Sequence, residues 1–170
     1  MIFLEHKLLY GVESRHEPRA PQVTEIVPRE DYTVPFGQAR VRREGAHVTV
    51  LATLLMAHLA LEAAEILAGD GLEVEVIDPR TLIPFDWPAL EASLRKTGRL
   101  VIVHEDHRRG GWGAEIAATV HAEYADLLRS PVQRVAAPFV PPPFSPPLED
   151  AFVPSVARIV NAVRRVVAEG

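Results

Sequence analysis

From Ala46 onward, short apolar runs alternate with longer stretches in which apolar residues recur every three or four positions. The run HVTVLAT at 47–53 is rich in β-branched residues, which is typical of a strand buried on both faces. Similar runs predict strands at 72–78, 100–105 and 131–137. Strands that alternate with helices predict a parallel sheet covered on both faces, and hence an α/β fold.

Between these strands the period changes to that of a helix. Helices are predicted at 56–71, after Asp86, at 113–128 and at 154–169. Glycines 69 and 71 are stop signals for the first helix, and Asp86 can cap the second, with Pro88 in its first turn. The inward-facing residues predicted by the spacing are Leu90 and Leu94 in the second helix and Val156, Ile159, Val160, Val163 and Val167 in the last. Six prolines between Pro138 and Pro147 argue against helix or strand pairing there.

The first 45 residues show no sustained period of 2 or 3.6, which indicates a linker. The short apolar segment Ile2 to Leu4 is expected to be the tail of a preceding unit. No basic region precedes it, so it does not resemble a signal peptide. The nearly uncharged run 48–61 is too short to span a bilayer.

Composition narrows the classes of function. Hydrophobic residues make up 48% and charged residues 24% of the 170 positions, as in ordinary globular domains. The net charge of -5 gives no footprint for nucleic acid or for an anionic membrane. The chain has no cysteine, which excludes thiol catalysis and a disulfide framework. We therefore expect a soluble protein, with the cytoplasm as its default location.

The strongest candidate for chemistry is the segment HEDHRRGGWG at 104–113, which follows a strand and opens a helix. Open α/β sheets place ligands at such positions, and Arg108 and Arg109 would complement an anion there. A phosphate site or a partner-binding loop is one interpretation. The other is a turn whose glycines allow tight packing of strand against helix. The spacing GGxG is not the GxGxxG dinucleotide fingerprint.

His104 and His107, with the carboxylates between them, invite a metal interpretation, but they do not form the HExxH motif. Positions at an edge or an interface are the better expectation for these histidines. The sequence also has no GxSxG elbow, no Walker loop and no Ser-His-Asp order, so no catalytic set is predicted. Trp87 and Trp112 are expected to be core or interface anchors.

Several long segments carry a family resemblance: IFLEHKLLY, VPREDYTVPFGQARVRREGAHVTVLAT, ALEAAEIL, EVIDPRTLIPFDWPALEASLRKTGRLVIVHE and GGWGAEIAA. Together they resemble the C-terminal, transketolase C-terminal-like domain of the beta subunit of thiamine-diphosphate-dependent 2-oxoacid dehydrogenases. Branched-chain, pyruvate and acetoin types belong to this family. The branched-chain and acetoin types look closest, because HE precedes their GG loop.

The resemblance implies a three-layer α/β/α fold with a mixed, mostly parallel five-stranded sheet. It divides the chain into a remnant of the preceding pyrimidine-binding domain (1–10), a linker (11–45) and the transketolase C-terminal-like domain (46–170). In the family, thiamine diphosphate and magnesium lie between an alpha subunit and the pyrimidine domain of beta. This chain has no GDG…N motif for them, so we expect no cofactor and no turnover in the chain alone.

The resemblance also implies partners: an alpha subunit, a second beta subunit in a homo-oligomeric contact, and the subunit-binding domain of a lipoyl acyltransferase. It turns the segment at 104–113 into an interface loop, whose residues are His104, Glu105, His107, Gly110, Gly111, Trp112 and Gly113. A stand-alone α/β module that binds a small anionic ligand at the GG loop stays the alternative.

Two positions depart from the family pattern. Leu54-Leu55 replaces an aromatic-Gly pair after the first strand, which predicts either no close ligand approach at that turn or a repacked contact. Arg129-Ser130-Pro131 replaces Asp-Ala-Pro at an acidic docking point for the acyltransferase. Because Ser130 cannot form a salt bridge, docking through Ser130 and Pro131 is questioned.

Overall fold

A computed structural model describes residues 2–10, 23 and 26–170. Five strands form one sheet: β1 (Arg40–Arg43), β2 (Val48–Ala52), β3 (Val74–Asp78), β4 (Leu100–His107) and β5 (Gln133–Ala137). Their order across the sheet is β1-β3-β2-β4-β5. β1 is antiparallel to β3, and the other neighbours are parallel. The sheet is therefore mixed and mostly parallel, as predicted.

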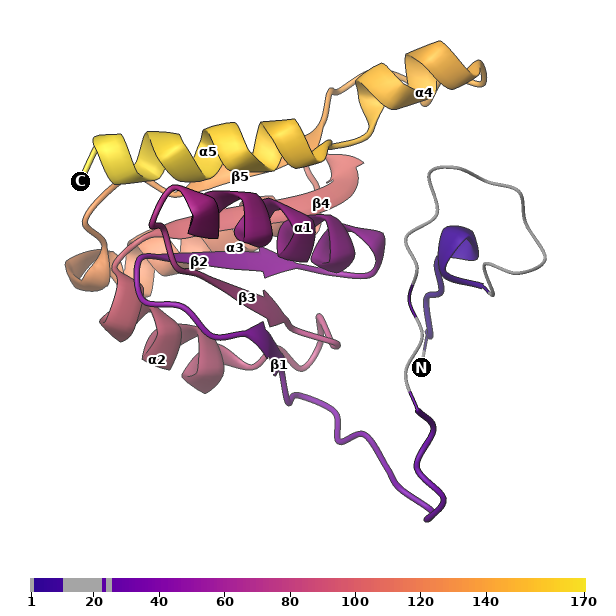
Figure 1. Cartoon of the computed structure of the whole chain (residues 1–170), viewed down its shortest axis with the longest axis horizontal. Helices are drawn as coiled ribbons and strands as arrows, with labels where there is room; N and C mark the ends of the chain where they lie inside the picture. The colour runs from indigo at the N-terminus through magenta and orange to yellow at the C-terminus, as the bar shows by residue number, and fades with distance from the viewer. Residues whose placement is uncertain (1, 11–22, 24–25) are drawn as a thin grey trace.

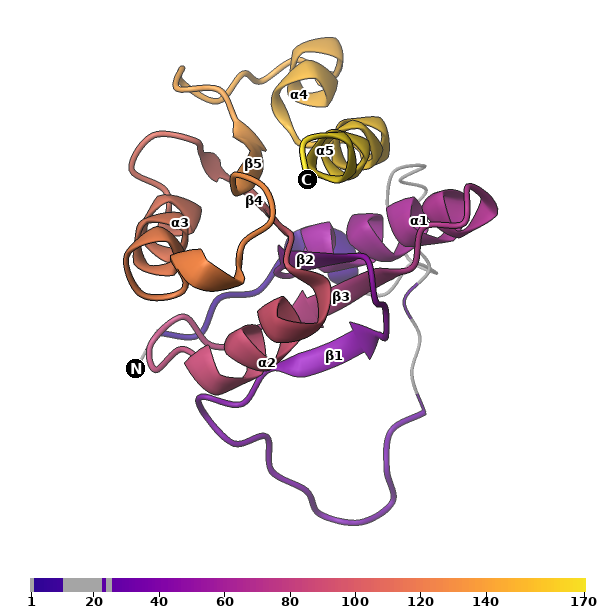
Figure 2. The ribbon, with the colours of Figure 1, turned by 90° about the vertical axis from the view of Figure 1, so that its left-hand side faces the viewer.

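Helices cover both faces of this sheet (Figures 1 and 2). The helices are α1 (Leu55–Gly69), α2 (Trp87–Thr97), α3 (Trp112–Glu123), α4 (Pro146–Phe152) and α5 (Val156–Ala168), with short 3-10 turns at Lys7–Leu9 and Ala125–Leu127. Side chains of α1 and α5 form one core cluster with the sheet, and side chains of α2 and α3 form a second. Two separate cores on opposite faces confirm the three-layer architecture.

The central strand β2 is buried at every position, because it is covered on both faces. Its Val50 pairs with Val76 of β3 on one side and with Val101 of β4 on the other. One polar side chain interrupts this apolar strand: the hydroxyl of Thr49 lies 2.6 Å from that of Ser93 and 2.7 Å from that of Thr97. This hydrogen-bonded group satisfies the buried hydroxyls and joins α2 to the sheet.

The predicted signals at the ends of α2 are confirmed. The Asp86 carboxylate accepts a hydrogen bond from the Ala89 amide at 3.1 Å, and Pro88 lies in the first turn. The other carboxylate oxygen of Asp86 accepts from the Ala39 amide at 2.7 Å, which fixes the chain just before β1. Gly98 ends the helix at a φ of 66°, and Leu90 and Leu94 are buried as predicted.

The edge strand β1 lies inside the segment 11–45 that was predicted to be a linker. Val41 pairs with Ile77, and the register shifts before Arg43. The short strand has no clear alternation, because an edge strand with two exposed residues shows little periodicity. The sheet therefore begins at Arg40, ahead of the predicted start at residue 46. Part of the remaining linker, residues 11–22 and 24–25, lies outside the described residues.

Two predictions near the end of the chain differ from the structure. The prolines between 138 and 147 do not exclude a helix throughout, because α4 begins at Pro146 and its first turn needs no proline N–H. In α5 the predicted stripe packs against the core, Val156 and Val167 being partly buried, but the fully buried Val166 was not predicted to belong to it. Among the described residues, no helix is long and apolar enough to cross a bilayer.

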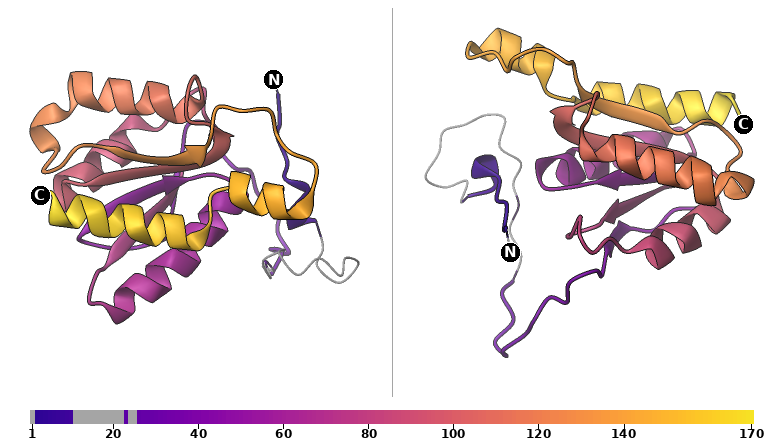
Figure 3. Two further views of the ribbon diagram at one scale, coloured as in Figure 1. Left: turned by 90° about the horizontal axis from the view of Figure 1, so that it is seen from above. Right: turned by 180° about the vertical axis from the view of Figure 1, so that it is seen from behind.

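The carboxyl ends of the parallel strands lie at one end of the molecule, near α4 and residues 2–10, while the C-terminus lies at the other (Figures 1 and 3). Leu8 and Leu9 pack against the core cluster of α1 and α5. Nε2 of His6 lies 3.0 Å from the carboxylate of Glu105 on β4. The N-terminal segment is thereby held at the edge where ligands usually bind in this class of fold.

Candidate functional site

The segment predicted as an interface loop divides between a strand and a loop. β4 runs through His107, so His104, Glu105 and His107 lie on the strand, and only residues 108–111 form the loop before α3. The strand is longer than predicted because β5 continues beside it: His107 pairs with Ala137, and the Arg108 amide donates to the Ala137 carbonyl at 2.8 Å. Trp112 and Gly113 open the helix.

The glycines of the loop serve close packing. A Cβ at Gly113 would lie 2.6 Å from Cδ2 of His104, closer still to its Nε2, and 3.0 Å from Cγ2 of Ile102. A Cβ at Gly111 would strike the His107 carbonyl oxygen and would lie 2.9 Å from Cε1 of His104. Gly110 differs, because its φ of 78° requires glycine while nothing lies within 4 Å. Two of the three glycines therefore let α3 approach β4.

His104 is a core residue, with 1% of its surface exposed, and does not take the expected edge position. The indole of Trp112 covers it, with 5.1 Å between the ring centroids. Neither ring nitrogen has a hydrogen-bond partner among the described residues. Burial lowers the pKa of His104 below its ordinary value of 6.5, outweighing the nearby Asp106, which raises it, while Arg134 lowers it further. The imidazole is thus held neutral.

The neighbouring polar residues of β4 hold other segments. Glu105 pairs with His6, as described above, and Nε2 of His107 lies 3.0 Å from the Val140 carbonyl oxygen. The His107 ring also contacts the rings of Phe139 and Phe152, with centroids 5.5 and 6.0 Å away. In the part of the chain that the structure describes, no three histidine or carboxylate side chains gather to hold a metal ion.

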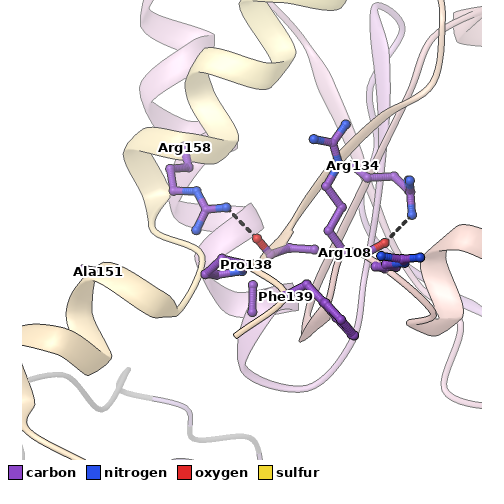
Figure 4. A pocket seen from close by; sticks show the side chains of 9 residues that line it. Arg108, Arg134, Pro138, Phe139, Ala151 and Arg158 are labelled. Atoms are coloured by element: carbon purple, nitrogen blue, oxygen red, sulfur yellow. Dashed lines mark hydrogen bonds between the residues drawn. The ribbon is translucent and has the colours of Figure 1, made fainter. Parts of the chain in front are cut away.

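A wide, open cavity of about 660 Å³ lies beside β5 and the end of β4, and four arginines line it. We call it the arginine cavity. Its lining residues are Arg108, Arg109, Arg134, Ala136, Ala137, Pro138, Phe139, Ala151 and Arg158 (Figure 4). The predicted anion-binding residues Arg108 and Arg109 are thus brought together with two arginines that sequence reasoning missed. Arg134 lies on β5 and Arg158 near the start of α5, far from the loop in sequence, so only the folded topology places them beside it.

The predicted docking residues lie at the other end of the sheet, in a shallow hollow of about 280 Å³ formed with His121, Ala125, Leu128 and Arg129. Ser130 is only 5% exposed, and its hydroxyl has no hydrogen-bond partner among the described residues. Pro131 is exposed. Gly170 packs against Ser130 so closely that a Cβ there would lie 3.3 Å from the serine Cβ. A partner arriving here would meet Pro131 before the serine hydroxyl.

The turn after β2 carries backbone strain. Leu54 has a φ of 51° and a ψ of -128°, a conformation that residues with a Cβ rarely adopt. Its side chain is 37% exposed at the carboxyl edge of the sheet, and Leu55 is buried. Leu54 therefore stands where the backbone favours glycine, and Leu55 packs in the core.

Comparison with known proteins gives a consistent result. Residues 37–159 match the family model of the transketolase C-terminal domain. The beta subunit of acetoin:2,6-dichlorophenolindophenol oxidoreductase from Cupriavidus necator is 40% identical over 170 residues, which is 100% of this chain and 47% of that subunit. The pyruvate dehydrogenase E1 beta subunit of Rickettsia felis is 40% identical over 166 residues, 98% of this chain and 48% of that subunit.

A solved split-gene transketolase, described as an inactive beta4 tetramer, is similar in structure. Its TM-score is 0.74 at 30% sequence identity, and the match covers 88% of this chain and 48% of that one. The chain therefore spans about half the length of the relatives that it matches.

Proposed function

The chain belongs to the transketolase C-terminal domain family, and from this premise we propose that it is the assembly and docking domain of the beta subunit of a 2-oxoacid dehydrogenase. The enzyme would decarboxylate a 2-oxo acid oxidatively and pass the acyl group to a lipoyl acyltransferase. The observation that carries this proposal is the alignment of essentially the whole chain, at 40% identity, with beta subunits of acetoin and pyruvate enzymes.

Exposed apolar side chains support a role in assembly. They cluster in three segments: 2–4, 26–36 and 139–148. Phe144, for example, is 98% exposed, and Ile26 is 97% exposed. Large apolar side chains in such number are uncommon on a domain that works alone and are typical of protein interfaces. The similar split-gene transketolase is a beta4 tetramer, which supports a homo-oligomeric contact in this chain as well.

The magnesium ion that accompanies the family's cofactor does not fit the described residues of this chain. Magnesium takes carboxylate, carbonyl and water oxygens, and the described residues hold no cluster of three or more histidine or carboxylate side chains. The cavity with four cationic side chains would repel the metal. We therefore propose that the magnesium ion, and with it the magnesium-bound thiamine diphosphate, lies in other parts of the assembly, and we assign no catalytic step to the described residues.

The segment 104–113 contributes to the proposed interface in a specific way. Glu105 and His107 hold residues 2–10 and the proline-rich segment at the carboxyl edge of the sheet. Two of the three apolar segments are thereby fixed on one side of the molecule. The alpha subunit and a second beta subunit are the proposed occupants of that side, and the acyltransferase would dock at the opposite end, near Pro131.

Size-exclusion chromatography with light scattering tests this function. The chain alone is expected to form dimers or larger species. With the alpha subunit of an acetoin or pyruvate enzyme, we expect a larger complex to elute. In parallel, the chain alone is expected to show no decarboxylation of a 2-oxo acid when thiamine diphosphate and magnesium are added.

A matched pair of variants sharpens the test. Phe144→Asp places a charge on the proline-rich segment and is expected to weaken association without changing the circular dichroism spectrum, because the side chain is 98% exposed. Ile66→Asp changes an apolar side chain on α1 that is 48% exposed and should leave association intact. A monomer that ignores the alpha subunit at every concentration, or turnover by the chain alone, would contradict the proposal.

A further inference from the structure

The arginine cavity has an arrangement that subunit assembly does not explain. Its cationic side chains come from three separate places: Arg108 and Arg109 from the loop after β4, Arg134 from β5 and Arg158 from α5. Figure 4 shows Arg134 and Arg158 on two sides of the cavity, with Pro138 and Phe139 between them. Convergence from three elements distinguishes this site from a run of charge along one helix.

Backbone contacts hold two of these side chains in place. Arg134 donates to the Arg108 carbonyl oxygen at 2.7 Å, and Arg158 donates to the Ala136 carbonyl oxygen at 2.6 Å. Each contact uses one of the five N–H donors of a guanidinium, which leaves donors for an anion. The Arg109 guanidinium lies 5.5 Å from the centre of the Phe139 ring, within the range of a cation–π contact.

Within the described part of the chain these arginines have no acidic partner. No carboxylate lines the cavity, and none of the four forms an ion pair with any described residue. Some arginines elsewhere in the chain do form ion pairs: Arg164 lies 2.6 Å from Asp70, and Arg165 lies 2.7 Å from Glu169. Acidic residues outnumber basic ones by 23 to 18, so composition does not account for an all-cationic cavity.

The unpaired charge has a cost at Arg158. Burial lowers the pKa of its guanidinium, which means that the surroundings disfavour the charged form. A bound anion would reverse this effect, because an opposite charge at hydrogen-bond distance favours the cation.

The lining of the cavity indicates the class of ligand. Four cationic side chains around one open hollow suit a compact anion, whereas an extended acidic segment would favour a longer cationic stripe. Guanidinium groups match phosphate oxygens in geometry and charge. The apolar remainder of the lining, from Phe139, Pro138 and the alanines, suits a ring or an alkyl group. We propose that the arginine cavity binds a small phosphorylated molecule with an apolar portion.

Calorimetric titration of the full chain tests this inference, with phenyl phosphate and inorganic pyrophosphate as probes. One probe is expected to bind per chain, and the affinity should fall as salt is raised to about 0.15 M because charged contacts are screened. Phenol, which lacks the phosphate, should not bind. Arg134→Gln and Arg158→Gln are each expected to weaken the binding of phenyl phosphate by about tenfold or more, since each removes a charge-assisted contact.

Two further variants keep the inference open to refutation. Arg109→Gln removes a charge without any hydrogen bond to the backbone, so its loss of affinity cannot be ascribed to misfolding. Arg165→Gln, at an exposed pair with Glu169 on α5, should bind as the parent does. An equal loss of affinity in Arg165→Gln would overturn the inference. So would the absence of any heat of binding with both probes. So would binding of a glutamate-rich peptide by a chain that ignores both phosphates. None of these outcomes depends on an alpha subunit, so the proposed function is tested separately.

Discussion

Replacing Gly113 with alanine tests whether the glycines of the GG loop serve packing. The new methyl group would lie 2.6 Å from Cδ2 of His104 and 3.0 Å from Cγ2 of Ile102, where ordinary contacts need 3.4–4 Å. His104 cannot move away easily, because it is 1% exposed and lies beneath Trp112. The helix α3 must therefore retreat from β4, or the imidazole must leave its rotamer.

The magnitude follows from two opposing effects. Overpacking in a well-packed core costs about 1–3 kcal/mol, and a shortfall of about 1 Å against a buried ring belongs near the upper end. Alanine in place of glycine in a helix returns up to about 1 kcal/mol. The expected net loss is about 2 kcal/mol, which lowers the melting temperature by about 4–8 °C in a chain of this size.

Thermal unfolding of three variants checks this reasoning. Gly69→Ala is the control, because it also lies in a helix but has nothing within 4 Å of the new Cβ, and it should be as stable as the parent or slightly more so. In a His104→Ala background the methyl group gains room, so adding Gly113→Ala should then cost little. If Gly113→Ala melts with the parent, or costs the same in both backgrounds, packing against His104 is not the reason for glycine.

Three other changes have defined outcomes. Leu54→Gly should stabilise the chain by about 1 kcal/mol, because it relieves a positive φ of 51° at a residue with a Cβ. Denaturant unfolding measures this change, and an unchanged or lower midpoint would show that the turn is not strained. The pKa of His104 is lowered in the folded chain, so the unfolded chain takes up the proton first, and the free energy of unfolding should fall as the pH drops below about 6.5 toward the folded pKa. His104→Leu should flatten this part of the pH profile, and an identical profile in both proteins would refute the assignment. Lys96→Met should cost about 2 kcal/mol, because it strands the 3% exposed Glu75 carboxylate, while Glu44→Gln at the 79% exposed partner should cost far less; equal losses would show that burial of Glu75 is not decisive.

The parallel part of the fold was predictable because its physical signals are local. Burial on both faces makes four of the five residues of β2 apolar, and the side-chain oxygen of Asp86 caps the helix that follows it directly in the sequence. The edge strand β1 carries neither signal. Two of its four residues are exposed, and its place in the sheet is set by pairing with β3, far along the chain. Such long-range pairing leaves little trace in the local sequence.

The residues of the candidate site also divide into those with a local sequence signal and those without one. Arg108 and Arg109 were found from the sequence because they adjoin the glycine loop. Arg134 and Arg158 could not be found in this way, because nothing in the local sequence distinguishes them: β5 has only one basic residue, and α5 has two further arginines that lie away from the cavity. His104 was misplaced for a related reason. A histidine beside two acidic residues suggests a position at the edge of the sheet. Side chains alternate between the two faces along β4, however, and this directs the His104 side chain into the core beneath α3.

The loop between β4 and α3 has two proposed roles, the close packing of α3 against β4 and the placing of arginines for an anion, and the first supports the second. The glycines at 111 and 113 bring α3 against β4, and this closeness fixes where residues 108–110 leave the strand. The Arg108 amide donates to Ala137, and its carbonyl accepts from Arg134, so the same peptide segment is tied to β5 at both ends. An arginine cavity built on so constrained a loop is preorganised for its anion, since little ordering of the main chain remains to oppose binding. It follows that Gly113→Ala should weaken the binding of phenyl phosphate as well as lower the stability of the chain, although residue 113 does not line the cavity. Unchanged affinity in a destabilised Gly113→Ala variant would separate the two roles.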